Sequence, residues 1–327
     1  MSDTSHASAM GSINWGEFVR KYLIIAIFFA LILLFALLTG GLTLQSQNLL
    51  NIIVQVAPIG ILACGMTFVI IALGIDLSVG SVVAFAAVVS ASLAQLPTAS
   101  PKMYEGLLLP AIVAILVALL VGAGAGFING FLISKFNIAP FIATLGMMTA
   151  ARGLTNIYTD ARPVSTLDPN YNMFGRGLMP IVIFIVVAVA THILLNHTRF
   201  GRHTYAIGGN EQAAKVSGIN VNRVKLKIYT LSGLFAGIAA IILTGRVGSA
   251  SPDLGMTMEL DAITAAVIGG TSFAGGIGTA WGTVVGALII GVINNGMTLM
   301  GISPFMQQVV KGVIIIVAII IDERKNR

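Results

Sequence analysis

Apolar residues fall into ten long runs along the chain, separated by short polar segments. The first run covers residues 22–40, and the others cover about 49–73, 78–96, 107–134, 139–158, 178–196, 226–245, 257–274, 279–299 and 305–321. A helix crosses the apolar part of a bilayer with about 20 mostly apolar residues, so each run has roughly the length of a membrane span. The pattern predicts an all-α, polytopic membrane protein with about ten transmembrane helices.

The composition agrees with this pattern. The 327 residues are 57% apolar and 9% charged, whereas soluble domains carry about 25% charged residues, so a water-soluble protein is excluded. The chain also has 37 glycines, which sit inside apolar runs. Because small residues mark helix contacts in membranes, they predict close helix packing. The single cysteine, Cys64, lies in an apolar run and is expected to be a small buried residue.

The basic residues predict the orientation of the chain. With ten spans and a cytoplasmic N-terminus, the C-terminus is also cytoplasmic, and residues 1–21 and 322–327 form two tails around a single membrane domain, 22–321. The cytoplasmic segments then hold Arg20, Lys21, Lys135, Arg199, Arg202, Lys215, Arg223, Lys225, Lys227, Arg324, Lys325 and Arg327, and the outer segments hold Lys102, Arg162, Arg176 and Arg246. The larger number of basic residues in the cytoplasmic segments follows the positive-inside rule. It accounts for the net charge of +6 without a nucleic-acid partner.

An internal repeat divides the membrane domain into halves, about 22–158 and 178–321. The segment Gly-Phe-Ile-Asn-Gly at 126–130 recurs as Gly-Val-Ile-Asn-Asn-Gly at 291–296, and Ile-Ala-Pro-Phe at 138–141 recurs as Ile-Ser-Pro-Phe at 302–305. Five predicted helices separate the copies, so the two halves cross the membrane in opposite directions. Inverted repeats are common in transport proteins, whose substrate path lies near the midplane between the halves.

The segment 197–225 is the most basic connection in the chain. Within it, Asn210 is suited to cap a short helix that starts with the acidic residue Glu211. Gly218 is suited to end that helix. A short capped helix outside the membrane is typical of a docking element, although topology alone would also produce a solvated basic loop here.

Three separated segments carry a family resemblance: residues 201–219 around this helix, residues 74–81 (Gly-Ile-Asp-Leu-Ser-Val-Gly-Ser), and residues 269–279 (Gly-Gly-Thr-Ser-Phe-Ala-Gly-Gly-Ile-Gly-Thr). From about residue 45 to 322, the chain closely resembles the ribose/galactose/xylose-type permease subunits of bacterial ABC sugar importers. The resemblance implies a multi-pass subunit of the bacterial inner membrane, dimeric with a second copy or a related chain. A periplasmic binding protein would deliver an uncharged pentose or hexose to it.

The resemblance also implies coupling to a cytoplasmic ATPase subunit through the 197–225 loop. Carried over position by position, the candidate ATPase contacts are Gly208, Gly209, Asn210, Glu211, Ala213, Ala214 and Gly218. The chain contains no Gly-x-x-x-x-Gly-Lys-Ser/Thr phosphate loop, since no glycine is followed by lysine. We therefore expect no ATPase site and no cofactor in this chain, with ATP and Mg²⁺ bound by the partner ATPase.

Five polar residues in or beside apolar runs are substrate-pathway candidates: Asp76, Asn129, Asp261, Asn294 and Asn295. Ionisable residues in a membrane are costly and mark function by default. Asp76 also precedes the run at 78–96, where it could cap the helix instead of contacting sugar. Asp261 either lies at the start of its helix or faces the interior of a dimer. The asparagines either bond between helices or line a path suited to hydroxyl-rich ligands.

Three features remain open. Arg152, inside the run at 139–158, could reach the headgroups, pair with a carboxylate or line a polar cavity. The outer loops 160–176 and 246–253 carry charges of both signs and could receive a partner. An ion-coupled secondary transporter or channel for a small polar solute is the alternative function, because inverted repeats serve such proteins equally well.

Overall fold

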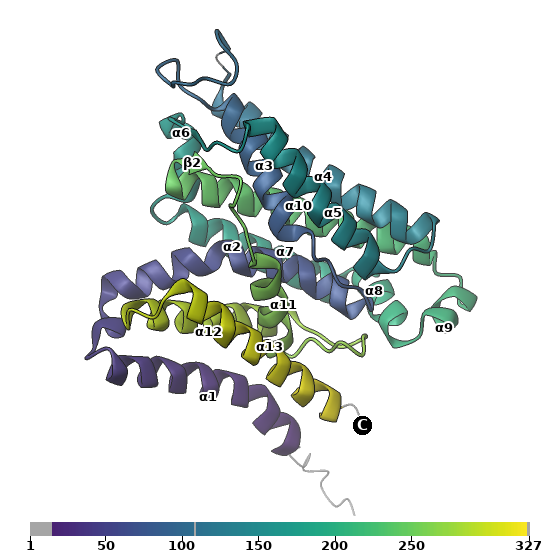
Figure 1. Ribbon diagram of the computed structural model, residues 1–327. Helices are drawn as coiled ribbons and strands as arrows, with labels where there is room; N and C mark the ends of the chain where they lie inside the picture. Colours follow the sequence, from purple (N-terminus) through teal and green to yellow (C-terminus); the bar gives the residue numbers. More distant parts are fainter. Residues whose placement is uncertain (1–14, 108, 326–327) are drawn as a thin grey trace, which may run out of the picture.

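The computed structural model describes residues 15–107 and 109–325, and the ends of the predicted tails, 1–14 and 326–327, lie outside the described residues. Each predicted run contains a helix (Figure 1). These helices are α1 (Trp15–Leu38), α2 (Ser46–Ile71), α3 (Val79–Leu93), α4 (Ala111–Lys135), α5 (Pro140–Thr159), α7 (Met179–His197), α10 (Val221–Val247), α11 (Met258–Ile268), α12 (Ala280–Leu299) and α13 (Pro304–Lys325). The all-α, polytopic prediction is confirmed, with α1 starting before and α13 continuing beyond the predicted limits.

Short elements connect the long helices. The 3₁₀ turn η1 (Leu42–Leu44) joins α1 to α2, and α6 (Pro169–Asn172) with the 3₁₀ turn η2 (Met173–Gly175) precedes α7. Two helices, α8 (Arg199–Gly209) and α9 (Glu211–Val216), lie in the predicted basic connection. The strands β1 (Val164–Ser165) and β2 (Ser249–Ala250) pair antiparallel, with Val164 opposite Ala250.

The predicted span at 257–274 is shorter than expected. Helix α11 has 11 residues, about 17 Å at 1.5 Å per residue, against an apolar thickness of about 30 Å. The segment before it is not helical, because Gly255 and Thr257 have positive φ angles of 74° and 65°. The loop after it reaches the end of α2, where the Gly276 N–H donates to the Ile71 carbonyl over 2.9 Å. A series of turns and a short helix therefore take the place of the predicted span.

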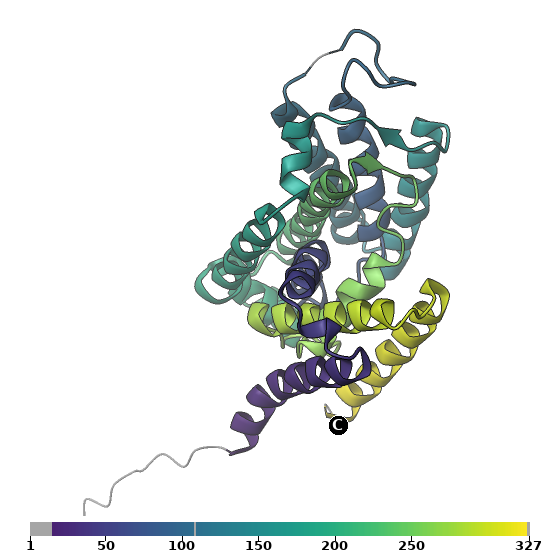
Figure 2. The same ribbon diagram turned by 90° about the vertical axis from the view of Figure 1, so that its left-hand side faces the viewer.

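The two halves are inverted and interlocked. Gly65 of α2 lies against Ser232 of α10, whereas Gly74, just beyond the end of α2, lies against Tyr229. Residue numbers therefore rise along α2 while those of its contacts on α10 fall, so these equivalent helices run antiparallel. Each half also packs on the other: α4 lies along α10, and α12 lies along α2. Figure 2 shows α2 surrounded by helices of both halves.

Glycines bring the backbones of α4 and α10 into direct contact. A methyl group added to Gly126 would overlap the Tyr229 carbonyl oxygen and lie 3.0 Å from the Gly233 backbone nitrogen. Gly122 faces Gly233 and Gly237 in the same way. Small residues let the two backbones touch, as predicted from the glycines in the apolar runs.

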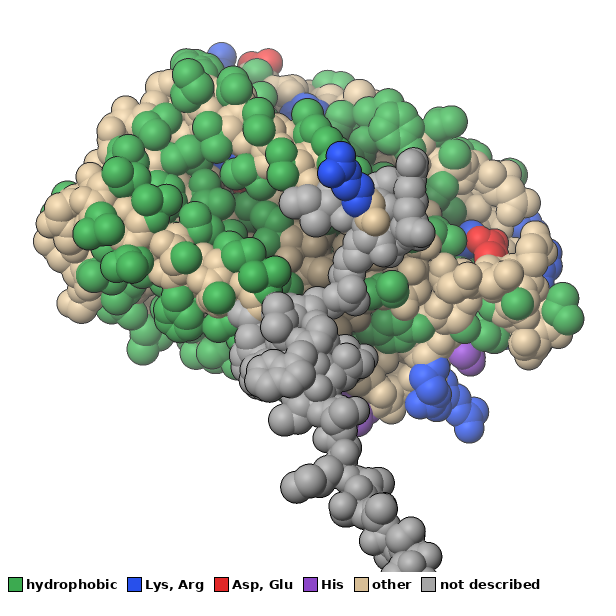
Figure 3. Space-filling model, turned by 90° about the horizontal axis from the view of Figure 1, so that it is seen from below, with side chains coloured by type: hydrophobic (Ala, Val, Ile, Leu, Met, Phe, Trp, Pro, Cys, Tyr) green, Lys and Arg blue, Asp and Glu red, His purple; other side chains and the backbone are tan. Residues whose placement is uncertain are grey.

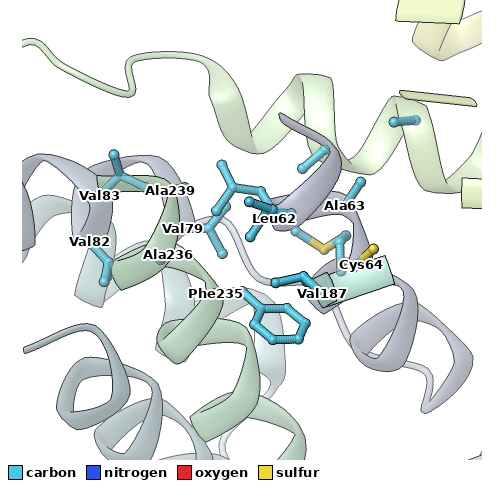
Figure 4. Close-up of a cluster of buried hydrophobic side chains, with 14 of the residues drawn as sticks. Leu62, Ala63, Cys64, Val79, Val82, Val83, Val187, Phe235, Ala236 and Ala239 are labelled. Atoms are coloured by element: carbon cyan, nitrogen blue, oxygen red, sulfur yellow. The ribbon is translucent and has the colours of Figure 1, made fainter. Parts of the chain in front are cut away.

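The core is built around α2, and the outside is apolar. Leu62 and the fully buried Cys64 of α2 pack against Val79 of α3, Val187 of α7 and Phe235 of α10 (Figure 4). Among the described residues, α2, α4, α7, α10 and α12 are long and apolar enough to cross a membrane. Apolar side chains also spread over the surface in Figure 3. Such a surface is suited to lipid, because soluble proteins rarely expose large apolar patches.

Candidate coupling site and transport pathway

The predicted capped helix in the basic connection is present as α9. The Asn210 side chain accepts a hydrogen bond from the Ala213 N–H over 2.9 Å, which satisfies one of the free N–H groups of the first turn. Gly218 follows the helix with a φ of 85°, a conformation that glycine adopts without steric cost. The boundaries and both caps of this helix therefore agree with the sequence prediction.

Helix α8, which the sequence did not reveal, fixes α9 to the body of the protein. Gly208 lies directly against the Ile71 carbonyl at the end of α2 and against the backbone of Gly276. The Tyr205 hydroxyl donates to the Gly278 carbonyl over 2.7 Å. Since no side chain separates the Gly208 and Gly276 backbones, α8 and the 269–279 loop form one packed unit.

The seven predicted coupling positions differ in exposure and fall into three groups. Gly208 and Ala214 are buried within the chain, where they position the helices. Glu211 is partly exposed and forms a 2.7 Å ion pair with Lys225. The exposed positions are Gly209, Asn210, Ala213 and Gly218.

Sequence reasoning missed Val216, whose side chain is 89% exposed. At about 100° per residue, Val216 lies on the helix face opposite the buried Ala214. The sequence signal for an exposed Val216 was its place on the helix face opposite the small residue Ala214. The exposed surface of α9 therefore combines an apolar tip with small residues.

The predicted outer loops come together at the other end of the molecule. The pairing of β1 with β2 joins the loop 160–176 to the loop 246–253. Gln95, at the end of α3, donates to the Ser165 carbonyl over 3.1 Å and accepts from the Met103 N–H over 2.9 Å. Figure 1 shows this loop cluster far from α9, which lies on the same side as the end of α13 and the first described turn of α1.

A buried polar cluster centres on Asp76, which is 1% exposed. One carboxylate oxygen accepts from the Ser78 N–H over 3.0 Å and from the Ser78 hydroxyl over 2.6 Å, and the other accepts from the Ser232 hydroxyl over 2.9 Å. Asn129 donates to the Ser78 hydroxyl over 2.9 Å. The carboxylate thus closes the turn just before α3 and joins that turn to α10.

Two atoms beside this cluster have no hydrogen-bond partner among the described residues: the amide oxygen of Asn129 and the hydroxyl of Tyr229. Buried polar groups usually have a partner, from protein or water. The cluster therefore has unused hydrogen-bonding capacity at the α4–α10 contact. The cap expected of Asp76 is not formed, because Ser78 is the N-cap residue of α3 and Asp76 accepts from the N–H of Ser78 itself and not from the first turn of the helix.

The other pathway candidates lie elsewhere. Asn295 forms two hydrogen bonds with Asn48 of α2, over 3.0 and 2.9 Å, as expected for an interhelical amide. The side-chain oxygen of its neighbour Asn294 has no partner among the described residues. Asp261 pairs with Lys311 of α13 over 2.9 Å, and both side chains are largely buried. Only Asp76 and Asn129 of the five candidates meet in one cluster.

Arg152 joins α5 to the loop that precedes α11. Its guanidinium donates to the Pro252 carbonyl and, over 3.2 Å, to the Leu254 carbonyl. A cation with several fixed donors suits a cluster of carbonyl oxygens. The sequence left the partner of Arg152 open, and the structure supplies it from loop backbone 100 residues away.

Two inverted helical halves of long apolar helices, with a buried polar cluster between them, are the architecture of a polytopic membrane permease. Comparison with protein families places the chain more closely. It belongs to the permease family described as "Branched-chain amino acid transport system / permease component", whose family model matches residues 48–319. This range agrees with the resemblance expected over residues 45 to 322.

Characterised relatives are similar over most of the chain. The ribose import permease protein RbsC of Bacillus subtilis is 46% identical over 86% of this chain and 87% of its own length. RbsC of Escherichia coli is 44% identical over 86% of this chain and 87% of its length. The galactose/methyl galactoside import permease protein MglC of Escherichia coli is 42% identical over 86% and 88%. No solved structure matched this chain.

Proposed function

We propose that this chain is the membrane-spanning subunit of an ATP-driven importer for a pentose or hexose. The observation that carries the proposal is the α8–α9 unit: a short capped helix, held rigidly by backbone contacts, projects from one end of a permease whose relatives are named for ribose and galactose import. Such a unit suits a machine driven by a protein partner. In this arrangement ATP and Mg²⁺ bind the partner ATPase, and this chain carries no ATPase site.

The orientation follows from the same unit. The proposed ATPase docks on α9 in the cytoplasm, which also places the start of α1 and the end of α13 there, in the inner membrane of a bacterium. Seven basic residues of α8, α9, α10 and the end of α4 support that side under the positive-inside rule: Lys135, Arg199, Arg202, Lys215, Arg223, Lys225 and Lys227. The β1–β2 loop cluster then faces the periplasm and receives the sugar-binding protein, and a second copy of the chain completes the pathway.

Asp76 and Asn129 are the proposed pathway residues with the strongest structural support. They lie between the inverted halves, where transport proteins bind their substrates. Sugar hydroxyls both donate and accept, so they suit the unpartnered amide oxygen of Asn129 and hydroxyl of Tyr229. Asp261, Asn294 and Asn295 lie outside this cluster and are expected to contribute mainly to packing between helices.

Reconstitution tests the proposed function against a gradient-driven carrier. The purified chain is placed in liposomes alone, or with its candidate ATPase and sugar-binding protein, and uptake of labelled ribose and galactose is measured. We expect uptake only in the complete system with ATP inside, and none when the phosphate-loop lysine of the ATPase is replaced. Robust uptake by the chain alone under a proton or sodium gradient would reject the proposal.

A charge reversal tests the docking surface. Glu211→Lys places a second cation beside Lys225, whereas Glu211→Gln removes the charge and keeps the size of the side chain. We expect Glu211→Lys to insert normally in the membrane but to retain little ATPase in a pull-down, and Glu105→Lys, on an exposed loop at the opposite end, to retain it fully. Normal ATPase binding by Glu211→Lys would remove Glu211 from the interface.

A further inference from the structure

The loop between α11 and α12, residues 269–279, contacts α8 on one side and α13 on the other; we call it the glycine loop. On the α8 side, Gly208 packs on the Gly276 backbone and Tyr205 donates to the Gly278 carbonyl. Gly276 also donates to the Ile71 carbonyl. Densely packed contacts transmit small displacements because there is no free volume between the atoms. A shift of α8 therefore has to move the glycine loop.

On the other side, the glycine loop holds the end of α13 through Asp322. One oxygen of the Asp322 carboxylate accepts from the Ser272 hydroxyl over 3.0 Å and from the Phe273 N–H over 3.0 Å. A carboxylate in the last turns of a helix is unfavourable for that helix, because the C-terminal end carries a partial negative charge. The donors of the glycine loop therefore offset the unfavourable position of the Asp322 carboxylate at the end of α13.

Helix α13 depends on such polar contacts for its position. Among the helices, it packs mainly on α11 and α12, and it lies at the edge of the molecule in Figure 2. Its outward side chains are apolar and exposed, including Phe305 at 80%. Near its middle, Lys311 pairs with Asp261 of α11. Partly buried side chains such as Val310 and Ile314 pack α13 against the core, and its charged contacts attach it to α11 and to the glycine loop, so a displacement of the glycine loop acts directly on the end of α13.

We propose that Asp322 is a positioning residue that ties α13 to the α8–α9 unit through the glycine loop. When the partner ATPase displaces α8–α9, the loop pulls on Asp322 and α13 follows. This inference rests on the proposed function and deepens it, since it names the route by which motion at the docking helix reaches a membrane helix. Hydrogen bonds to a carboxylate are about twice as strong as neutral ones, which suits such a link.

The test compares coupling in Asp322→Ala, Asp322→Asn and wild-type protein, reconstituted with the ATPase and sugar-binding protein. Sugar uptake and ATP hydrolysis are measured in the same proteoliposomes. We expect Asp322→Ala to keep ATP hydrolysis within about twofold of wild type and to lower the sugar moved per ATP about tenfold, the effect of losing one charge-assisted link. Asp322→Asn still offers an acceptor to both donors, so it should restore part of the loss.

Two further variants make the result specific. Ser272→Ala removes the hydroxyl donor of the glycine loop and should lower coupling less than Asp322→Ala, whereas Gln47→Ala, an exposed polar side chain at the start of α2 outside the proposed docking surfaces, should leave it unchanged. Unchanged sugar per ATP in both Asp322→Ala and Ser272→Ala would overturn the inference. If Asp322→Ala is not recovered as a folded dimer, the sugar moved per ATP by Asp322→Asn and Ser272→Ala tests the inference in its place. Failure of wild-type protein to transport would instead count against the proposed function.

Discussion

Substituting one glycine in the α4–α10 contact should destabilise the protein through backbone overlap alone. In Gly126→Ala the new methyl group overlaps the Tyr229 carbonyl oxygen and lies 3.0 Å from both the nitrogen and the Cα of Gly233. Carbon atoms pack best at about 3.5–4.0 Å, so the helices have to move apart by roughly 1 Å. Neither neighbour is a side chain that can rotate away. Overpacking of this kind costs about 1–3 kcal/mol.

Gly124→Ala is the matched control, because it adds the same methyl group to the same helix two residues away, where nothing lies within 4 Å. Any change in helix propensity is therefore common to both variants. Thermal unfolding of the purified proteins in detergent should place Gly126→Ala several degrees below wild type and Gly124→Ala at or above it. Equal melting temperatures for the two variants would show that the helices do not touch at Gly126.

Three further outcomes are expected from the same unfolding assay and from transport measurements. Lys311→Met leaves the buried Asp261 carboxylate without its cation and should cost about 3–5 kcal/mol, most of which Asp261→Asn should restore in the double variant. Asp76→Ala strands the groups that donate to the carboxylate and should cost about 2–4 kcal/mol, whereas Asp76→Asn keeps an acceptor; full transport by Asp76→Asn would argue against an essential charge. Asn295→Leu should cost about 1–2 kcal/mol because the Asn48 side-chain oxygen loses its donor, although the Asn48 nitrogen still donates to the Thr43 carbonyl. A double variant with both asparagines replaced by leucine that is no more stable than Asn295→Leu would contradict this explanation.

Hydrophobic pattern was enough to predict the helices, because length and polarity alone decide whether a segment can cross a bilayer. It overestimated α11, since residues 269–274 belong to a loop and not to a helix, and this loop contacts α8 through Gly275, Gly276 and Gly278. The caps of α9 were predictable from Asn210 and Gly218, whose side-chain and backbone preferences act locally. Helix α8 was not, because its buried face is set by contacts with the distant glycine loop.

The candidate site shows the same division between local and distant causes. That Asp76 would accept hydrogen bonds beside α3 followed from its position before a helix. Its bond to Ser232 and the neighbouring Asn129 could not be read from sequence, since they come from α10 and α4. Arg152 is the clearest case, because its partners are backbone carbonyls, which no side-chain pattern records.

The inverted repeat is consistent with the proposal that a docking element lies in one half only. The connection from α1 to α2 in the first half corresponds to the connection from α7 to α10 in the second, and inversion places the two at opposite ends of the molecule. The first is a short turn containing η1, and the second contains both α8 and α9. Had both connections been built alike, one copy would project at the end that bears the β1–β2 cluster. An elaborated connection in one half alone is what a single driving partner at one end requires.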